Sequence, residues 1–447
     1  MAVDVRARGD PPASDQAGAV ALAYAGLSSY ALGVSVLWNS LHPLLIPLVV
    51  LSLVPEERKN GVLGLVTFVG LLVAMLVQPV AGTLSDRART RWGRRRPFIV
   101  AGTLGTAALV LALGQAADVA TLLALYVVLQ AISNVALGAY QGLIPDLVPS
   151  ARRGLAAGAK SFAEILGLIV AALAMPALVG DGRIGAGFAA AVVVLALAAA
   201  VTCLAVREPP SPEPPAGPGP ASRPSPPVDA ASMGVGADGP AVGLADVRLL
   251  SGQPNVAWLL AGRLCFMVAL TTIQTFALFY LRDVLRPPDY LSLWRDLTAS
   301  IGLAVLVVSY PAGLLADRLG RRRLVLVAGG CGAVGALLLL GAADPGGVLL
   351  FGGLIGLAVG LFLPSSWALA IDLAPPGQGG RFLGLTNLAT AGGAALARLN
   401  GPLIDWANGL SPLLGYQLML VLTALLFAAG GLLTQRVRES TGADQYR

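Results

Sequence analysis

Ionisable side chains inside apolar segments are the residues of this sequence that could do chemistry. Glu164 and Lys160 lie four residues apart in the apolar stretch 157–179, so a helix would place them on one face. Burial away from water raises the affinity of a carboxylate for a proton, as a proton-coupling site requires. We therefore consider two roles for Glu164: a coupling carboxylate, and the structural salt-bridge partner of Lys160.

Two arginines occupy later apolar stretches. Arg263 is a candidate for binding an anionic or hydroxyl-rich ligand, and also for neutralising Glu164 across a central cavity. For Arg398 we predict a pairing with Asp405, which would make that arginine structural.

Uncharged polar residues complete the candidate site. Asn39 and His42 are three residues apart and would share a helix face that lines the cavity, although a lone buried histidine is more often a packing residue. Trp38 either stacks on a ligand ring or anchors the helix at the membrane interface. The remaining polar candidates are Gln130, Asn134, Gln141, Gln274 and Asn387.

The composition indicates a membrane protein. Of 447 residues, 56% are hydrophobic and 12% are charged, and the mean hydropathy is +0.76. A soluble protein carries about a quarter of its residues as charged ones, so much of this exterior must face lipid. The basic residues lie in short segments between apolar runs, which is a topology pattern rather than a nucleic-acid-binding stripe. With one histidine and no paired cysteine spacing, we expect no metal site.

Twelve apolar stretches are long enough to cross a bilayer, which takes about 20 residues. They form two sets of six. We predict an all-α membrane protein with twelve transmembrane helices in two pseudo-symmetric six-helix bundles. The predicted spans are 24–52, 61–84, 98–117, 120–144, 157–179, 184–206, 255–281, 294–316, 323–342, 346–371, 382–406 and 413–435.

A proline-rich segment divides the chain. We predict a flexible linker at 207–250 between bundles at 22–206 and 251–436, with a disordered tail at 1–21 and a second tail at 437–447. With the N-terminus inside, the inner loops and tails hold 21 of the 30 Lys and Arg residues. The positive-inside rule therefore predicts that both termini and the linker are cytoplasmic.

An Asp-Arg loop motif occurs once in each half. The first copy is GTLSDR at 82–87 and the second is GLLADR at 313–318, each followed by further arginines. Each copy also precedes an Asp-Leu-x-Pro sequence, at 146–149 and 372–375. Two signatures at matching places in both halves indicate a duplicated six-helix unit.

These loops suggest a cytoplasmic gate. Glycine permits close helix approach, and the arginines can pair with Asp146 or Asp372, which would latch the two halves in one state. The alternative is that the arginines only fix topology. The predicted gate residues are Gly82, Asp86, Arg87, Arg94, Asp146, Arg153, Gly313, Asp317, Arg318, Arg322, Asp372 and Arg381.

The duplicated loop resembles that of the major facilitator superfamily over nearly the whole chain. Within it, VQPVAG at 77–82, GRRRPFI at 93–99 and IPDLVP at 144–149 look like the sucrose–proton and glycoside–cation symporters. The resemblance implies alternating access to a site between the halves. Gln130 stands where the sucrose–proton symporters keep a proton-carrying carboxylate, a departure that argues against proton coupling at this position.

These observations lead us to expect a monomeric secondary transporter in the cell membrane. The first hypothesis is symport of a small polar solute, a sugar or glycoside, with H⁺ or Na⁺ as the coupling ion and no cofactor. The alternative is export of drugs or metabolites by proton antiport, which the lack of a Gly-Pro-rich signature at 158–167 disfavours. The sequence has no phosphate-binding loop, zinc motif or nucleophilic triad, so we expect neither enzymatic activity nor a nucleic-acid partner.

Overall fold

The computed structural model describes residues 13–88, 90, 92–149, 152–206, 254–374 and 379–437. The predicted linker at 207–250 lies outside the described residues, as do the first twelve residues and nearly all of the predicted C-terminal tail. The described residues are helical throughout, without a strand.

The first group of helices matches the predicted N-terminal spans. Its first crossing is formed by three consecutive segments, and its fourth crossing ends in a separate short helix. The elements are α1 (Ala13–Ser40), η1 (Leu41–Leu45), α2 (Ile46–Leu53), η2 (Glu56–Arg58), α3 (Lys59–Arg87), α4 (Arg96–Leu113), α5 (Val119–Gln141), α6 (Leu143–Leu147), α7 (Arg153–Val179), η4 (Gly180–Gly182) and α8 (Ile184–Ala205).

The second group repeats this pattern after the linker. Its elements are α10 (Pro254–Tyr280), η5 (Leu281–Leu285), α11 (Tyr290–Leu319), α12 (Arg321–Leu339), α13 (Pro345–Leu373), α14 (Gly379–Arg398), α15 (Asn400–Leu410) and α16 (Leu414–Thr434). Aspartates at the N-caps start several of the helices: the carboxylates of Asp118, Asp289 and Asp344 accept hydrogen bonds from backbone N–H groups of the first turn.

Eleven of the described helices are long and apolar enough to cross a membrane. One further crossing, the eleventh in chain order, is made by α14 and α15, which follow one another with a break at Leu399. Polar residues near this break, including Arg398 and Asn400, lower its hydropathy. The twelve-helix prediction is therefore confirmed. One boundary was wrong: α1 begins at Ala13, inside the segment predicted as a disordered tail, because alanine-rich sequence there favours helix.

The first helix of each half ends in a π-helical segment. In the N-terminal half this is η1, which contains His42 and Pro43, and in the C-terminal half it is η5, which contains Arg282 and Asp283. Single π-helical turns that interrupt α-helices are frequently found at functional sites. The internal duplication is therefore seen in the backbone conformation of the two halves as well as in their loop motifs.

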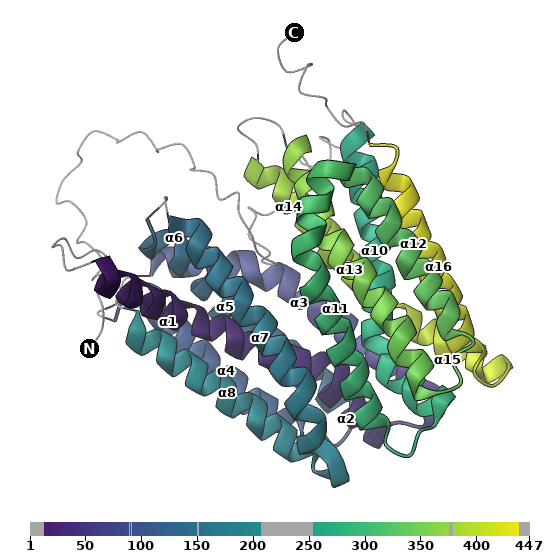
Figure 1. Ribbon diagram of the computed structural model, residues 1–447. Helices are drawn as coiled ribbons and strands as arrows, with labels where there is room; N and C mark the ends of the chain where they lie inside the picture. The colour runs from purple at the N-terminus through teal and green to yellow at the C-terminus, as the bar shows by residue number, and fades with distance from the viewer. Residues whose placement is uncertain are drawn as a thin grey trace.

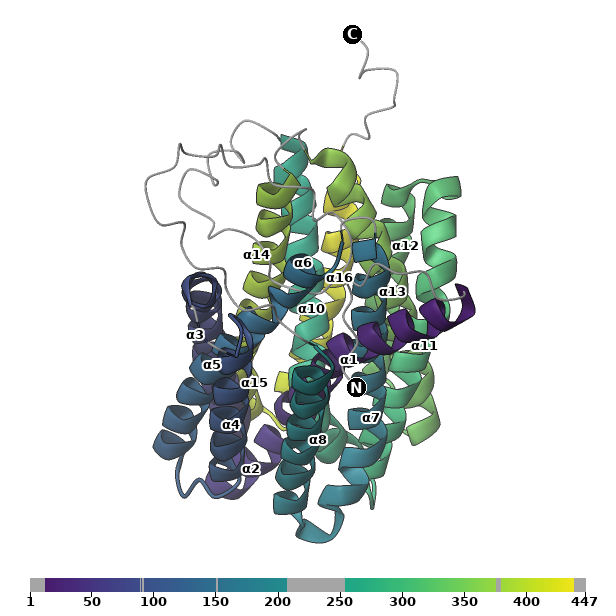
Figure 2. The ribbon, with the colours of Figure 1, turned by 90° about the vertical axis from the view of Figure 1, so that its left-hand side faces the viewer.

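The two halves meet at one end of the molecule. Figures 1 and 2 show two bundles that lie together around α2 and α15 and are separated at the opposite end, where α6 and the start of α14 lie. The halves contact one another through α3 with α14 and α15, α7 with α11, and η1 with α10. We call the joined end the far end, and the end that carries the Asp-Arg loops the linker end.

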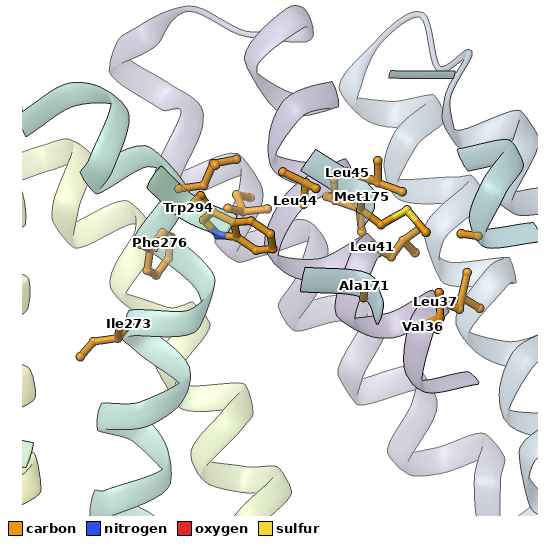
Figure 3. Packing of buried hydrophobic residues seen from close by; sticks show 14 of the residues in the cluster. Val36, Leu37, Leu41, Leu44, Leu45, Ala171, Met175, Ile273, Phe276 and Trp294 are labelled. Atoms are coloured by element: carbon orange, nitrogen blue, oxygen red, sulfur yellow. The ribbon is translucent and has the colours of Figure 1, made fainter. Parts of the chain in front are cut away.

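Apolar side chains from both halves seal the far end. Leu44 and Met175 of the N-terminal half and Phe276 and Trp294 of the C-terminal half are at most 2% exposed and belong to one continuous core cluster. Figure 3 shows Trp294 between Phe276 and Leu44. Burial of such side chains stabilises this contact by about 1.5–3 kcal/mol for each fully buried group.

Two glycines let the helix backbones of the two halves touch. A Cβ atom added at Gly64 of α3 would lie 2.2 Å from the carbonyl oxygen of Arg398, and one added at Gly401 of α15 would lie 2.1 Å from the carbonyl oxygen of Asn60. These contacts are with backbone atoms, which cannot turn aside as a flexible side chain can. The packing of α3 on α14 and α15 thus depends on the lack of side chains at both positions.

We predict that Gly64→Ala weakens this packing. The added methyl group forces the backbones of α3 and α14 apart, an overpacking that costs about 1–3 kcal/mol. The purified variant should show a lower thermal-unfolding midpoint than the wild type. Gly302→Ala on α11 is the matched control, since a Cβ there meets nothing within 4 Å. An unchanged midpoint in Gly64→Ala would contradict the account.

Candidate functional site

A network of charged and polar side chains joins the two halves at the far end. Arg282 of η5 binds Glu56 through two hydrogen bonds, Nη2 to Oε1 at 2.6 Å and Nη1 to Oε2 at 3.0 Å. Lys59 is buried and pairs with Glu56 and, across the interface, with Asp283 at 2.5 Å. Opposite charges thus alternate across the contact between η2 and η5.

Neighbouring polar groups extend this network to α15 and α16. Asp405 accepts hydrogen bonds from the Asn60 side chain at 2.8 Å and from the Gly61 backbone N–H at 2.6 Å. The Tyr416 hydroxyl donates to Asp283 at 2.5 Å. We call the set the far-end network; its members are Glu56, Lys59, Asn60, Arg282, Asp283, Asp405 and Tyr416.

The sequence did not predict this network. Neither Lys59 nor Arg282 is among the candidate residues of the sequence analysis. The signal that could have found them is the complementary charge after the first helix of each half, with Glu56 and Lys59 in one and Arg282 and Asp283 in the other. Their pairing still depends on how the halves are rotated against each other.

At the linker end, the predicted arginine–aspartate pairs form within each half. Asp146 accepts hydrogen bonds from Arg94 at 2.6 Å and from Arg95 at 3.1 Å, and Arg95 also donates to Ser85. Asp372 pairs with Arg321. Among the described residues these pairs join helices of one half, so in this conformation they do not hold the halves together.

The gate role predicted for Arg322 and Gly313 in the C-terminal half stays a prediction. Arg322 donates to the carbonyl of Val437, and its neighbour Arg321 donates to the carbonyl of Ala368 on α13. Gly313 makes no close contact with the described helices, since a Cβ there meets nothing within 4 Å, and the halves are apart at this end. Arg318 is exposed on the last turn of α11. The side chains of Gly82, Asp86, Arg87, Arg153, Asp317 and Arg381 lie outside the described part of the chain.

Glu164 lies in a cluster between α1 and α7. Its carboxylate is 3.3 Å from the ammonium group of Lys160, and the lysine side chain is 10% exposed against 29% for the glutamate. The Ser35 hydroxyl donates to the carbonyl of Glu164 at 2.6 Å, and Asn39 donates to the carbonyl and hydroxyl of Ser35. The predicted pairing of Glu164 with Lys160 is confirmed, and Asn39 belongs to the same cluster.

A second cluster connects η1 with α5. Asn134 donates to Oε1 of Gln130, so the Gln130 amide N–H₂ faces Tyr126 and donates to its hydroxyl at 2.7 Å. The Tyr126 hydroxyl also shares a hydrogen bond with Nε2 of His42, at 2.7 Å. Trp38 stacks on His42 with ring centroids 4.8 Å apart.

Arg263 does not neutralise Glu164. Its guanidinium donates to Thr390 at 2.9 Å and to Ser366 at 2.5 Å, and it lies over the ring of Trp367. Arg263 does not reach Glu164 because the rotation of α10 about its axis directs this side chain towards α13 and α14 of its own half. Within the described part of the chain, Arg263 is a buried cation bound only to hydroxyl groups and an aromatic face.

The predicted pairing of Arg398 with Asp405 is also wrong. A continuous helix would bring residues seven apart close to one face, but α14 ends at Arg398 and α15 starts at Asn400. The break directs Asp405 to Asn60 and Gly61. The Arg398 guanidinium instead donates to the carbonyl of Ala394 in its own helix.

The other predicted polar residues lie apart from these clusters. Gln141 accepts a hydrogen bond from Gln78 at 2.9 Å, nearer the linker end. Gln274 is exposed on α10, and Asn387 is half-buried on α14. Among the described residues no group of His, Cys, Asp and Glu could hold a metal ion.

A match to a family model identifies the family of this duplicated fold. The model of the Major Facilitator Superfamily matches residues 17–398 and 288–444. The chain belongs to the Major Facilitator Superfamily. It is therefore a multi-pass membrane transporter of small solutes rather than an enzyme.

Curated relatives match this superfamily member over short segments. A sucrose transport protein of Arabidopsis thaliana is 36% identical over 93 residues, which is 21% of this chain and 18% of the relative. A sucrose transport protein of Oryza sativa subsp. indica is 43% identical over 94 residues, 20% of this chain and 18% of the relative. The matched segments thus span about a fifth of each relative's length.

Solved structures of transporters superpose on nearly the whole chain. A mutant form of the nucleoside transporter NupG gives a TM-score of 0.70 at 13% identity, covering 93% of this chain and 99% of that one. A bacterial homologue of the human lysosomal transporter Spinster, in an inward-facing and unoccupied conformation, gives 0.66 at 14% identity, covering 96% and 98%. At these identities the likeness establishes the fold.

We predict that Asp283→Asn opens the far end. The change keeps the size of the side chain but removes the charge that Lys59 faces across the interface, at a cost of about 1.5–3 kcal/mol, or roughly ten- to hundredfold in the opening equilibrium. For this experiment a cysteine replaces the buried Leu63 in a background without native cysteines. The measurement is the rate at which a membrane-impermeant maleimide, applied at the far side, labels this cysteine. The rate should rise by a similar factor.

Asp296→Asn is the control for this experiment, because Asp296 pairs with the adjacent Arg295 of its own half. It should leave the labelling rate unchanged. Equal rates in wild type and Asp283→Asn would show that the far-end network does not close this end.

Proposed function

We propose that this transporter moves a sugar or glycoside by symport with a proton or a sodium ion. The curated sucrose transport proteins support the solute class, through partial matches only. The observation that carries the coupling is the Glu164–Lys160 pair, a carboxylate and an ammonium held at 3.3 Å within an apolar helix. Ionisable residues inside transmembrane segments commonly serve ion or proton pathways.

The proposed coupling works through the charge of this pair. While Glu164 is ionised it neutralises Lys160, and when it takes up a proton or contacts a sodium ion the lysine becomes free to change partner. Ser35 donates to the backbone carbonyl of Glu164 and Asn39 donates to Ser35, so a shift of this turn of α7 reaches α1, whose last turn carries Trp38. Cation binding would thus alter the surroundings of the solute.

We further propose that the linker end faces the cytoplasm. The arginine-rich loops after α3 and α11 lie at this end, and cytoplasmic loops carry the excess of Lys and Arg. With the far end sealed and the linker end separated, the conformation would then be inward-facing. Both ends and all the polar clusters lie within a single chain, so a monomer in the cell membrane suffices for this cycle.

We predict that Glu164→Gln abolishes gradient-driven accumulation of solute. With one-to-one proton coupling, each unit of pH gradient sustains about tenfold accumulation. In proteoliposomes with an imposed proton or sodium gradient, wild type should accumulate radiolabelled sucrose or a related glycoside and lose this accumulation with an ionophore. The Glu164→Gln variant should equilibrate the solute without concentrating it, because the amide cannot bind a proton or compensate a cation.

Glu57→Gln is the matched control, since Glu57 is an exposed carboxylate in the far-end loop. It should accumulate solute like the wild type. Full gradient-driven accumulation by Glu164→Gln would remove Glu164 from the coupling mechanism, and failure of every sugar tested to enter would refute sugar transport.

A further inference from the structure

Two exposed arginines flank the turn between α11 and α12 at the linker end. Arg318 lies in the last turn of α11 and Arg323 in the first turn of α12. Gly320, with a φ of 91°, is the single residue between the two helices. Among the described residues, no carboxylate lies within ion-pair distance of either guanidinium. The turn therefore presents two positive charges at the same end of two neighbouring helices.

The other arginines of this turn are bound within the protein. Arg321 pairs with Asp372, and Arg322 donates to the carbonyl of Val437. In the corresponding loop after α3, Asp146 pairs with two arginines. The two arginines that flank the α11–α12 turn are thus the ones available to a partner from outside the chain.

Arg318 continues an apolar face of α11. Leu314 and Leu315 precede it by four and three residues, so the three side chains share one side of the helix, and both leucines are exposed. The 30 residues of α11 extend about 45 Å, whereas the hydrocarbon core of a bilayer is about 30 Å thick. The last turn of α11 therefore reaches the polar headgroup region, and the leucines one turn earlier face the acyl chains.

Arg323 begins an equivalent face of α12. Leu326 and Val327 follow it by three and four residues, and both are exposed. One turn further along, a Cβ added at Gly330 would meet nothing within 4 Å, so no described helix covers this side of α12. An arginine beside such a face lays its apolar stem along it and extends its guanidinium to the headgroups.

We infer that Arg318 and Arg323 together bind the phosphate of an anionic phospholipid in the leaflet at the linker end. Guanidinium groups bind phosphate through paired, charge-assisted hydrogen bonds. The exposed apolar residues beside each arginine pack on the acyl chains of the same lipid, which a free phosphate ion lacks. The site attaches the C-terminal half to this leaflet. It goes beyond the proposed sugar transport and does not depend on it.

The test measures which lipid lies beside Leu315. In the full chain without native cysteines, Leu315→Cys carries a bimane fluorophore, and the protein is reconstituted in phosphatidylcholine nanodiscs. A small fraction of the lipid carries a nitroxide on its acyl chain, with either a phosphatidylglycerol or a phosphatidylcholine headgroup. From the quenching, phosphatidylglycerol should associate about fivefold or more tightly at low salt, because arginines near the surface attract anionic lipid. About 0.5 M salt should weaken this preference.

The variants exchange exposed side chains. Arg318→Gln combined with Arg323→Gln should remove the preference, and the corresponding pair of lysine substitutions should retain part of it, because the charge stays while the paired hydrogen bonds are lost. Arg295→Gln is the control at the opposite end of α11, where the arginine pairs with Asp296, and it should leave the preference unchanged.

A second label position separates a site from a general attraction. Bimane at Leu338, an exposed residue near the far end of α12, should be quenched equally by both lipids. An equal preference at both label positions would overturn the site, as would equal quenching by the two lipids at Leu315 in wild type.

Two further outcomes decide the partner. Millimolar inorganic phosphate should leave the phosphatidylglycerol preference intact, and displacement of the lipid by phosphate would identify a site for soluble phosphate instead. A preference that persists after both glutamine substitutions would refute the role of Arg318 and Arg323. Each of these outcomes is independent of sugar uptake, so the proposed function stands or fails separately.

Discussion

The cost of placing a charge in lipid constrains every ionisable residue between the ends of this transporter. Lys160 meets that cost by pairing with Glu164, and Arg263 meets part of it with two hydroxyl groups and a tryptophan face. Among the described residues, Arg398 has only a carbonyl of its own helix. Lys160 thus belongs to a neutral ion pair, Arg263 is a cation bound by neutral groups, and Arg398 is a cation without a compensating carboxylate among the described residues.

The same constraint explains why the two ends of the molecule differ. At the far end, charges of one half meet opposite charges of the other, and the apolar contact of Leu44 with Trp294 excludes water beside them. At the linker end, Asp146 and Asp372 form ion pairs with arginines of their own halves. Pairing between halves closes one end, and pairing within halves leaves the other free to separate.

Much of the fold could be predicted because helices in a bilayer are long and apolar, and the duplicated loops indicated two halves. The Glu164–Lys160 pair and the use of Asp146 and Asp372 by arginines were predicted because the partners lie on one helix or beside one short loop. The sequence did not indicate that Arg321 in particular pairs with Asp372, because this depends on the exact rotation of α12.

Contacts between the halves were beyond prediction from one sequence. Asn60 and Asp405 are 345 residues apart, and their hydrogen bond depends on how two rigid bundles are oriented. The break at Leu399 separates Arg398 from Asp405, and Gly401 and Pro402 mark it in the sequence, because Pro402 has no N–H to donate to the carbonyl of Arg398. The residues that are most informative about solute binding are therefore those whose partners come from the other half.

The central claim is that closure at one end accompanies opening at the other. Spin labels at Arg58 and Arg286 report the far end, and labels at Trp92 and Arg318 report the linker end, all at exposed positions. Pulsed electron paramagnetic resonance should show that solute and coupling ion lengthen the first distance and shorten the second in the same sample. Distances that change together in one direction, or a far end that never opens, would contradict the account.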